Sequence, residues 1–217
     1  IGAKIDGLSS KFSGLQAIAT GAMFAIGNAA VGMGQKLASS MTESIRQGFG
    51  EYETKIGSVQ TILANTSKHG TKLADVTKSL GELNDYADKT IYSFGDMTRN
   101  IGLFTNAGLK LETSTSMIKG FSNTAAASGT NAQGAANAAY QLSQALSAGT
   151  IRLMDWRSLQ NVGMGNNNMK TGLLDIAKAM KTIDPKTAQA AMKDFNGSLE
   201  KGWLSADVMS NYLQIMA

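Results

Sequence analysis

The chain has 217 residues, of which 43% are hydrophobic and 17% are charged, and its formal net charge is +4 at pH 7. A chain of this length can bury a core, in one domain or in one domain with an arm. The positive charge is weak and dispersed, which disfavours a protein that neutralises many nucleic-acid phosphates. The absence of cysteine excludes disulfides and thiolate metal sites.

Residues 12–35 form the first notable segment, because no charged side chain lies between Lys11 and Lys36. A membrane-spanning helix needs about 20 predominantly apolar residues, so the length is sufficient. Polar side chains and glycines interrupt the segment, and a glycine lowers helix propensity by about 1 kcal/mol relative to alanine. Two interpretations stay open, namely a helix packed against its own domain or copies of itself, and a membrane-inserting segment. Close packing is favoured by small residues at every fourth position, Ala17, Gly21, Ala25 and Ala29.

The helix is predicted to continue to about residue 64, because apolar residues recur at spacings of three and four. These residues are Leu37, Met41, Ile45, Phe49, Tyr52, Ile56, Val59 and Leu63. A polar cluster at 65–70 then ends the pattern. We therefore expect residues 1–64 to form a long amphipathic, Ala/Gly-rich helical arm.

Beyond residue 70 the sequence predicts short helices with recognisable ends. They are expected over about 72–89, from Ser93 to Gly108, over 112–128, from Asn131 to Gly149, over 155–162 and 166–182, from Pro185 to Leu199, and from Ser205 onward. The predicted N-caps are Ser93 (with Asp96 three residues on), Asn131, Asp155, Asp184 (before Pro185) and Ser205. The residues expected to face inward in 166–182 are Met169, Leu173, Ile176 and Met180. No segment shows the alternation of a strand, so the fold class is all-α, with a globular multi-helix domain over 65–217.

A second uncharged stretch lies between Lys119 and Arg152 and is rich in Ala, Ser, Asn and Gln. Such a composition is compatible with disorder. The apolar anchors expected within it are Phe121, Tyr140, Leu142 and Leu146. Because these anchors are accompanied by alanines that permit close helix contacts, a packed helical hairpin is favoured.

The sequence predicts no catalytic, cofactor-binding or metal-ligating residue. His69 is the only histidine, and it lies in a polar turn without the further ligands or the motif of a metal site or a serine hydrolase. The carboxylate pairs Glu51/Glu53 and Asp85/Asp88 are expected on solvent-facing helix surfaces, not across a glycosidase cleft. The turn Gly163-Met164-Gly165 precedes Asn166 without a phosphate-binding motif, so we interpret it as a loop–helix junction and not an anion site.

Asp155-Trp156-Arg157 is the cluster with the most ambiguous chemistry. Trp and Arg are enriched at binding hot spots, which favours an interface. A core Trp beside a capping Asp and a surface Arg is an equally good interpretation. The sequence leaves both open.

Several segments resemble the helical domain of phage tail tape measure proteins. They are ETKIGSVQTILANT (53–66), ADKTIYSFGDMTRNIGLFTNAG (87–108), SMIKGFSNTAAASGTNAQGAANAAYQLSQALSAGTIRLMDWRSL (116–159) and NVGMG (161–165). The likeness covers about residues 48–180, with the motifs in the family's order, and residues 1–47 resemble the Ala/Gly-rich helix before that domain more weakly. The family's proteins are much longer, and the chain begins with Ile1 and not Met, so we expect it to be part of a longer polypeptide.

The resemblance implies a structural protein of a siphophage, prophage or tailocin tail and not an enzyme. Such a protein sets tail length, scaffolds assembly of the tail tube in the host cytoplasm and leaves the tail during DNA ejection. The implied partners are the tail tube protein, tail assembly chaperones, distal tail or tail tip proteins, and further copies in a parallel trimer or hexamer. Contacts with the host membrane and with passing DNA are also implied, and a membrane-active ejection or channel-forming protein acting through residues 12–35 is the alternative function.

Overall fold

The computed structural model describes residues 49–217, with side chains from residue 58 onward. Its helices are α2 (Phe49–Thr66), α3 (Leu73–Ala87), α4 (Phe94–Asn106), α5 (Leu111–Ala127), α6 (Ala132–Ala148), α7 (Leu153–Asn161), α8 (Asn167–Ala179), α9 (Pro185–Lys193), α10 (Phe195–Ser198) and α11 (Ala206–Ile215), with 3-10 turns η2 (Ser67–His69) and η3 (Leu199–Lys201). No strand occurs within 49–217, so the all-α prediction is confirmed for that range. The predicted helical arm before residue 49 lies outside the described residues.

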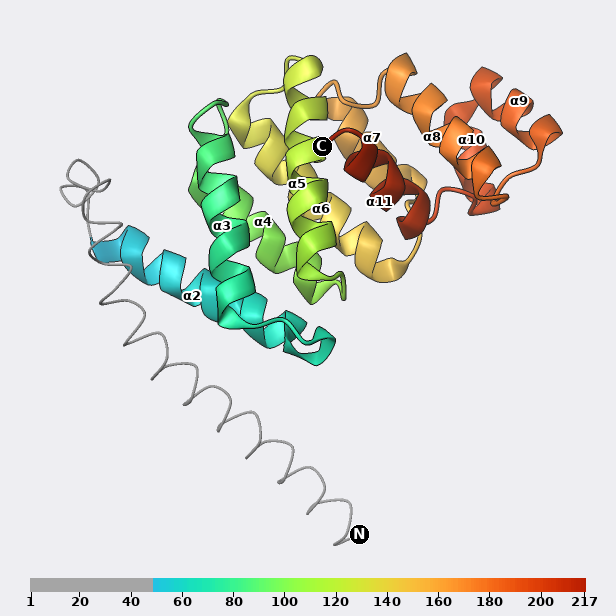
Figure 1. Cartoon of the computed structure of the whole chain (residues 1–217). Helices are drawn as coiled ribbons and strands as arrows, with labels where there is room; N and C mark the ends of the chain where they lie inside the picture. Colours follow the sequence, from blue (N-terminus) through green and yellow to red (C-terminus); the bar gives the residue numbers. More distant parts are fainter. Residues whose placement is uncertain (1–48) are drawn as a thin grey trace, which may run out of the picture.

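The helices form two groups joined by α11 (Figure 1). In the first group α3 and α4 pack against α5, α6 packs against α4, and α2 lies along α4. The second group, α8 to α10, lies at the opposite end of the molecule from α2 (Figure 1). Although α11 comes last in the chain, it packs against α5 and also contacts α6 and α8. The last helix therefore ties the two groups together.

The segment that precedes α7 and the segment that precedes α11 lie side by side. Thr150 and Ser205 form an isolated antiparallel bridge. The Ile151 amide donates to the Leu204 carbonyl at 2.9 Å, and the Ala206 amide donates to the Gly149 carbonyl at 2.9 Å. This pair of hydrogen bonds closes the base of the excursion that contains α7 to α10.

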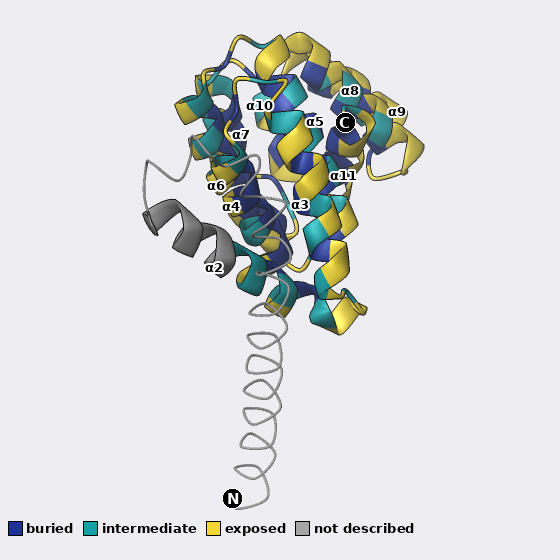
Figure 2. Cartoon of the chain, turned by 60° about the vertical axis from the view of Figure 1, so that its left-hand side comes forward, coloured by how far each residue is buried: buried dark blue, intermediate teal, exposed yellow. Residues whose placement is uncertain are grey.

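One contiguous hydrophobic core runs through the described helices. It extends from Ile62 of α2 to Leu213 of α11, both completely buried. The helices turn buried residues inward and exposed residues outward, as Figure 2 shows for α3 and α5. Amphipathic helices too short to be stable alone are held by such shared burial.

Several predicted helix ends are confirmed by their hydrogen bonds. The Ser93, Asn131 and Ser205 hydroxyl or amide oxygens accept from backbone amides of the first turns of α4, α6 and α11. Gly149 ends α6 with φ of 80°, in the left-handed region that favours glycine. At the other end of the domain, α2 ends at Thr66, within the polar cluster predicted to break the helix.

Other details of the prediction are wrong. Asp155 is not the N-cap of α7; Arg152 is, and the Asp155 carboxylate accepts from the Arg152 amide at 2.8 Å from the third helical position. Met180 does not face inward, because α8 ends at Ala179 and the Met180 side chain is 38% exposed. Tyr140 is not a core anchor, since it is 47% exposed on α6.

The helix expected from Pro185 to Leu199 is also divided in two. Its first part, α9, ends at Lys193, and the Asp194 carboxylate caps α10 by accepting from the Gly197 amide at 2.9 Å. The break turns Phe195 into the core, where its ring lies 5.4 Å from that of Trp203. An aromatic contact thus overrides the helical periodicity of the segment.

The uncharged, alanine-rich stretch is helical and not disordered. It supplies the second half of α5 and all of α6, and Ala125, Ala138 and Ala139 within it are buried. Short side chains at these positions let neighbouring helices approach closely. The helical part of the prediction is therefore confirmed, but the two helices do not pack mainly as a hairpin, because α6 packs chiefly against α4 and contacts α5 less.

The helices α5 and α11 approach each other closely where they cross at Gly120. A Cβ atom added to Gly120 would lie 1.7 Å from the Leu213 carbonyl oxygen, so the two backbones are in direct contact. Beside this point the Asn123 amide donates to the Met216 carbonyl at 2.8 Å. The Tyr86 hydroxyl donates to the side-chain oxygen of Asn123 at 2.5 Å, which joins α3 to the same crossing.

Gly120→Ala is expected to lower the free energy of unfolding by about 1–3 kcal/mol, the usual cost of overpacking, because the backbone of α11 must move. Gly81→Ala on α3 is the matched control, since a Cβ there meets nothing within 4 Å. That change should stabilise by about 0.5–1 kcal/mol. Urea denaturation of both full-length variants measures the difference. Equal effects of the two substitutions would contradict the close crossing.

Alkaline pH is expected to weaken the fold through two buried tyrosines and one half-buried tyrosine, Tyr86. Burial raises the pKa of Tyr86, Tyr92 and Tyr212 above the usual value, and for Tyr86 the charge of neighbouring Tyr92 adds to the effect. A raised pKa in the folded state leaves stability intact below the unfolded pKa of about 10 and removes it as pH rises through the folded pKa. Urea unfolding at stepwise increasing pH should show this fall, and Tyr92→Phe should make it shallower. A stability that stays flat through tyrosine ionisation would contradict the burial argument.

Candidate functional site

A surface groove of about 460 Å³ lies between α4 and α6. It is lined by Asp96, Arg99, Asn100, Leu103, Gln133, Ala136, Asn137, Tyr140 and Gln141. On each helix these residues recur at spacings of three and four, so each helix contributes one side-chain stripe. The space between two such stripes can receive the side chains of a third segment.

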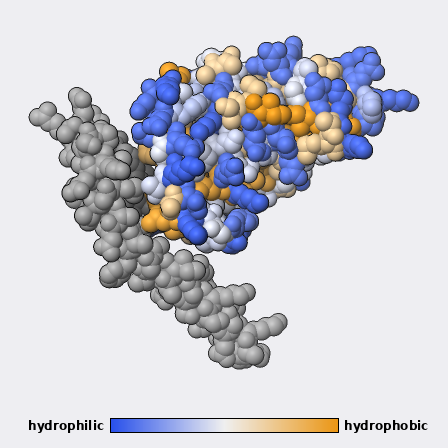
Figure 3. Space-filling view, viewed as in Figure 1, coloured by the Kyte–Doolittle hydropathy of each residue, from blue (hydrophilic) through white to orange (hydrophobic). Residues whose placement is uncertain are grey.

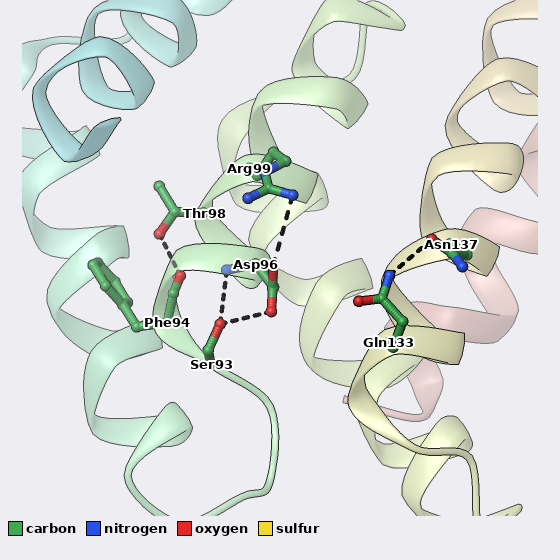
Figure 4. A network of polar contacts seen from close by, with 7 residues as sticks. All are labelled: Ser93, Phe94, Asp96, Thr98, Arg99, Gln133 and Asn137. Atoms are coloured by element: carbon green, nitrogen blue, oxygen red, sulfur yellow. Dashed lines mark hydrogen bonds and ion pairs between the residues drawn. The ribbon is translucent and has the colours of Figure 1, made fainter. Parts of the chain in front are cut away.

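The charged residues of the groove lie on α4 and neutralise each other. The Ser93 hydroxyl caps α4 by accepting from the Asp96 amide at 3.1 Å, and it donates to the Asp96 carboxylate at 2.7 Å (Figure 4). Arg99 approaches the same carboxylate at 3.8 Å. This ion pair is solvent-exposed and contributes little to stability. Its effect on the groove is to leave the lining without net charge.

The α6 wall of the groove is made of neutral polar side chains. The Gln133 side-chain amide donates to the Asn137 side-chain oxygen at 3.1 Å (Figure 4). Tyr140 exposes part of its ring one turn further along. Each amide offers both donors and acceptors, so this wall can bind uncharged polar groups. It lacks the mainly apolar lining of a small-molecule pocket and the cations of a phosphate site.

A second, more apolar groove of about 350 Å³ lies between α8 and α9. Leu174, Pro185, Ala188 and Met192 supply its apolar lining, and Met192 is 50% exposed. An ion pair between Asp175 and Lys178 at 2.7 Å stands at its edge. Elsewhere, Figure 3 shows hydrophobic residues on the face that carries α11, where Ile215 is exposed.

The candidate chemical residues do not come together in the structure. His69 is exposed in η2, and Asp85 and Asp88 are exposed at the end of α3. The side chains of Glu51 and Glu53 lie outside the described residues. Within the part of the chain that is described, no three His, Cys, Asp or Glu side chains are grouped so that they could hold a metal ion.

The turn Gly163-Met164-Gly165 is a loop–helix junction. Met164 is completely buried, and the Asn166 side chain caps α8 by accepting from the Met169 amide at 3.1 Å. The turn is also anchored to the rest of the fold, because the Thr130 hydroxyl donates to the Val162 carbonyl at 2.6 Å. These contacts explain the turn by packing and capping alone.

Trp156 belongs to the core and not to an exposed interface. Its side chain is completely buried, and its ring centroid lies 4.6 Å from that of Phe195. Its indole N–H has no hydrogen-bond partner. Arg157, by contrast, is exposed. The structure thus decides for a core Trp beside a surface Arg, a choice that the sequence left open.

The sequence does not identify the residues of the α4/α6 groove as a site. It predicts Ser93 and Asp96 only as a capping pair, and Tyr140 as a core anchor. The signal that was present is the polar stripe of Gln133, Asn137 and Gln141 on one face of α6.

No helix within residues 49–217 is long and apolar enough to cross a membrane. The segment proposed for membrane insertion, 12–35, lies outside that range.

The chain was compared with protein families, curated proteins and solved structures. A family model described as tape measure protein matches residues 48–217. Neither a curated protein nor a solved structure matches the chain. The matched range begins one residue before α2 and runs through α11, so it contains every described helix.

Trp156→Ala is expected to lower the free energy of unfolding by about 3–5 kcal/mol, as for other buried aromatic residues, because it leaves a cavity beside Phe195. Arg157→Ala, the neighbouring exposed position, should change it by less than about 0.5 kcal/mol. Thermal or urea denaturation of the full chain measures both. A mild effect of the Trp156 change would mean that this side chain is not packed in the core.

Proposed function

The chain belongs to the tape measure protein family, and from this membership we propose that it is a structural protein that sets the length of a phage tail and scaffolds assembly of the tail tube. The family is one of structural phage proteins, and the match over residues 48–217 carries the proposal. The role we propose is one of shape and length.

A helical arm supplies a simple physical ruler. An α-helix rises about 1.5 Å per residue, so chain length converts directly into distance. A tube that polymerises around such an arm stops where the arm ends. We assign this measuring role to the part of the predicted arm (residues 1–64) that precedes α2, since α2 itself packs along α4 as part of the domain.

The described helices form a different kind of unit. A compact domain of this size has a radius of gyration of about 15 Å, which corresponds to a globule roughly 40 Å across. Several such globules do not fit side by side in a narrow tube. We propose that the domain sits at one end of the tube, or opens when it is confined, while the arm runs along the tube.

The proposal carries specific partners and places. The protein would assemble in the host cytoplasm with the tail tube protein, tail assembly chaperones and distal tail or tip proteins. It would lie in the virion tail as a parallel trimer or hexamer, and it would leave ahead of the DNA during ejection. The weak net charge of +4 suits a protein that lets DNA pass without retaining it.

Deleting residues 12–35 in frame from the full-length gene is expected to shorten tails, because the segment would account for about 36 Å of helix. Duplicating the same segment should lengthen tails by a similar amount. Tail lengths are measured by electron microscopy of purified particles.

The control replaces residues 12–35 by a shuffled order of the same amino acids, which should leave tail length unchanged because a ruler depends on residue number. Tails of normal length after the deletion would refute length measurement by this segment. Complete failure of assembly after the deletion would indicate a docking role in its place.

A further inference from the structure

Residues 152–203, which contain α7 to α10, are called the α7–α10 unit here, and the two ends of this unit lie side by side. Just outside it, Thr150 and Ser205 form the antiparallel bridge, and the Ile151 amide donates to the Leu204 carbonyl at 2.9 Å. Residues paired across such a bridge have Cα atoms about 4.5–5.5 Å apart. The chain on either side can therefore keep its position whether the unit is packed or unfolded.

The α7–α10 unit has an aromatic cluster of its own. The ring centroid of Phe195 lies 4.6 Å from that of Trp156 and 5.4 Å from that of Trp203. The Trp203 indole N–H donates to the Ser198 hydroxyl at 3.1 Å. All four residues belong to the unit, and α10 packs against both α7 and α9. These contacts are made without the helices of the first group.

The unit is docked on the rest of the domain through α7 and α8. Helix α7 packs against α6, and α8 packs against α11. The Thr130 hydroxyl donates to the Val162 carbonyl at 2.6 Å. A Cβ atom added to Gly172 would lie 2.7 Å from the Tyr212 ring, so α8 touches α11 closely there. The remaining helices of the unit extend away from α2, toward the opposite end of the molecule (Figure 1).

Local structure makes the unit less stable than the first group. Helices α7 and α9 have 9 residues each and α10 has 4, whereas α3 to α6 have 13 to 17. Short helices depend on tertiary contacts for their stability. Lys181, just after α8, has a φ of 58°, and this left-handed conformation is unfavourable for a residue with a side chain. Regions of this kind open at lower free energy than the core helices.

We propose that the α7–α10 unit opens and closes cooperatively while α3 to α6 and α11 stay packed. The bridge between Thr150 and Ser205 holds the ends of the unit together in both states. The opening is a property of the free chain and does not depend on the role proposed for the protein in the tail. For a confined domain, which rests on that proposed role, the released residues can lie along the tube axis while the first group remains folded.

Hydrogen–deuterium exchange of the full chain tests the proposal. Phe195→Ala removes the centre of the aromatic cluster and should speed exchange throughout residues 152–203 by at least about a hundredfold, as expected for a buried aromatic side chain. Exchange in α4 to α6 should change by less than about threefold. Phe121→Ala on α5, a position of nearly equal burial, is the matched control and should speed exchange in α4 to α6. Equal acceleration of both regions by Phe195→Ala would overturn the proposal, because the domain would then open as a whole.

Tryptophan fluorescence gives a second readout that needs no substitution. The chain has two tryptophans, Trp156 and Trp203, and both lie in the α7–α10 unit, so their emission reports on this unit. In increasing urea, the emission should change at a lower concentration than that at which α4 to α6 lose amide protection. Coincident transitions would contradict separate opening.

A shortened chain tests whether the remaining helices need the unit. Residues 152–203 are replaced by Asn-Gly, a dipeptide that closes two-residue hairpins. Because Ile151 and Leu204 are already hydrogen-bonded, α3 to α6 and α11 should keep their amide protection to within about tenfold. The control replaces α6 (Ala132–Ala148) by the same dipeptide and should lose protection across the domain. Loss of protection in the chain that lacks only the unit would overturn the proposal.

Discussion

The contact between α5 and α11 is the constraint on which the arrangement of the helices depends. Gly120 has no side chain, so the backbone of α11 at Leu213 can lie directly against α5. From that position α11 reaches both α6 and α8 and joins the two groups of helices. Asn123 completes the crossing by binding the Met216 carbonyl, and Tyr86 extends the contact to α3. The absence of a Cβ atom at Gly120 thus permits the position of α11 against α5, through which the two groups of helices are joined.

Much of the fold could be predicted from the sequence, because helix ends are encoded locally. Ser93, Asn131 and Ser205 begin their helices through side chains that bind their own first turns, and such signals need no tertiary contact. The errors occur where tertiary contacts or an alternative capping geometry determine the helix end in place of the predicted local signal. The Asp155 side chain binds the start of α7 from the third helical position and is not itself the N-cap. Phe195 packs against Trp203 in the core, at the break between α9 and α10. Periodicity cannot show either outcome.

The candidate site was harder to predict for a similar reason. A polar stripe on one helix looks like an ordinary solvent-facing surface until the neighbouring helix is known. The groove exists only because α4, from a distant part of the sequence, lies beside α6 and supplies the second stripe. Tyr140 shows the difficulty, since an aromatic residue in an alanine-rich helix is expected inside, yet it lies partly exposed at the groove. Trp156 shows the opposite case, a residue type common at interfaces that is completely buried.

The bridge between Thr150 and Ser205 has a consequence for how this chain relates residue number to distance. The chain departs at Ile151 and is back beside the same residue at Leu204, so everything between these two positions is a closed detour. While the bridge is intact, α7 to α10 add mass and surface to the domain but do not lengthen the path between its two ends. In the ruler proposed above, these residues would contribute no length. Insertions or losses within the detour would change the bulk of the domain and leave any measured distance as it was.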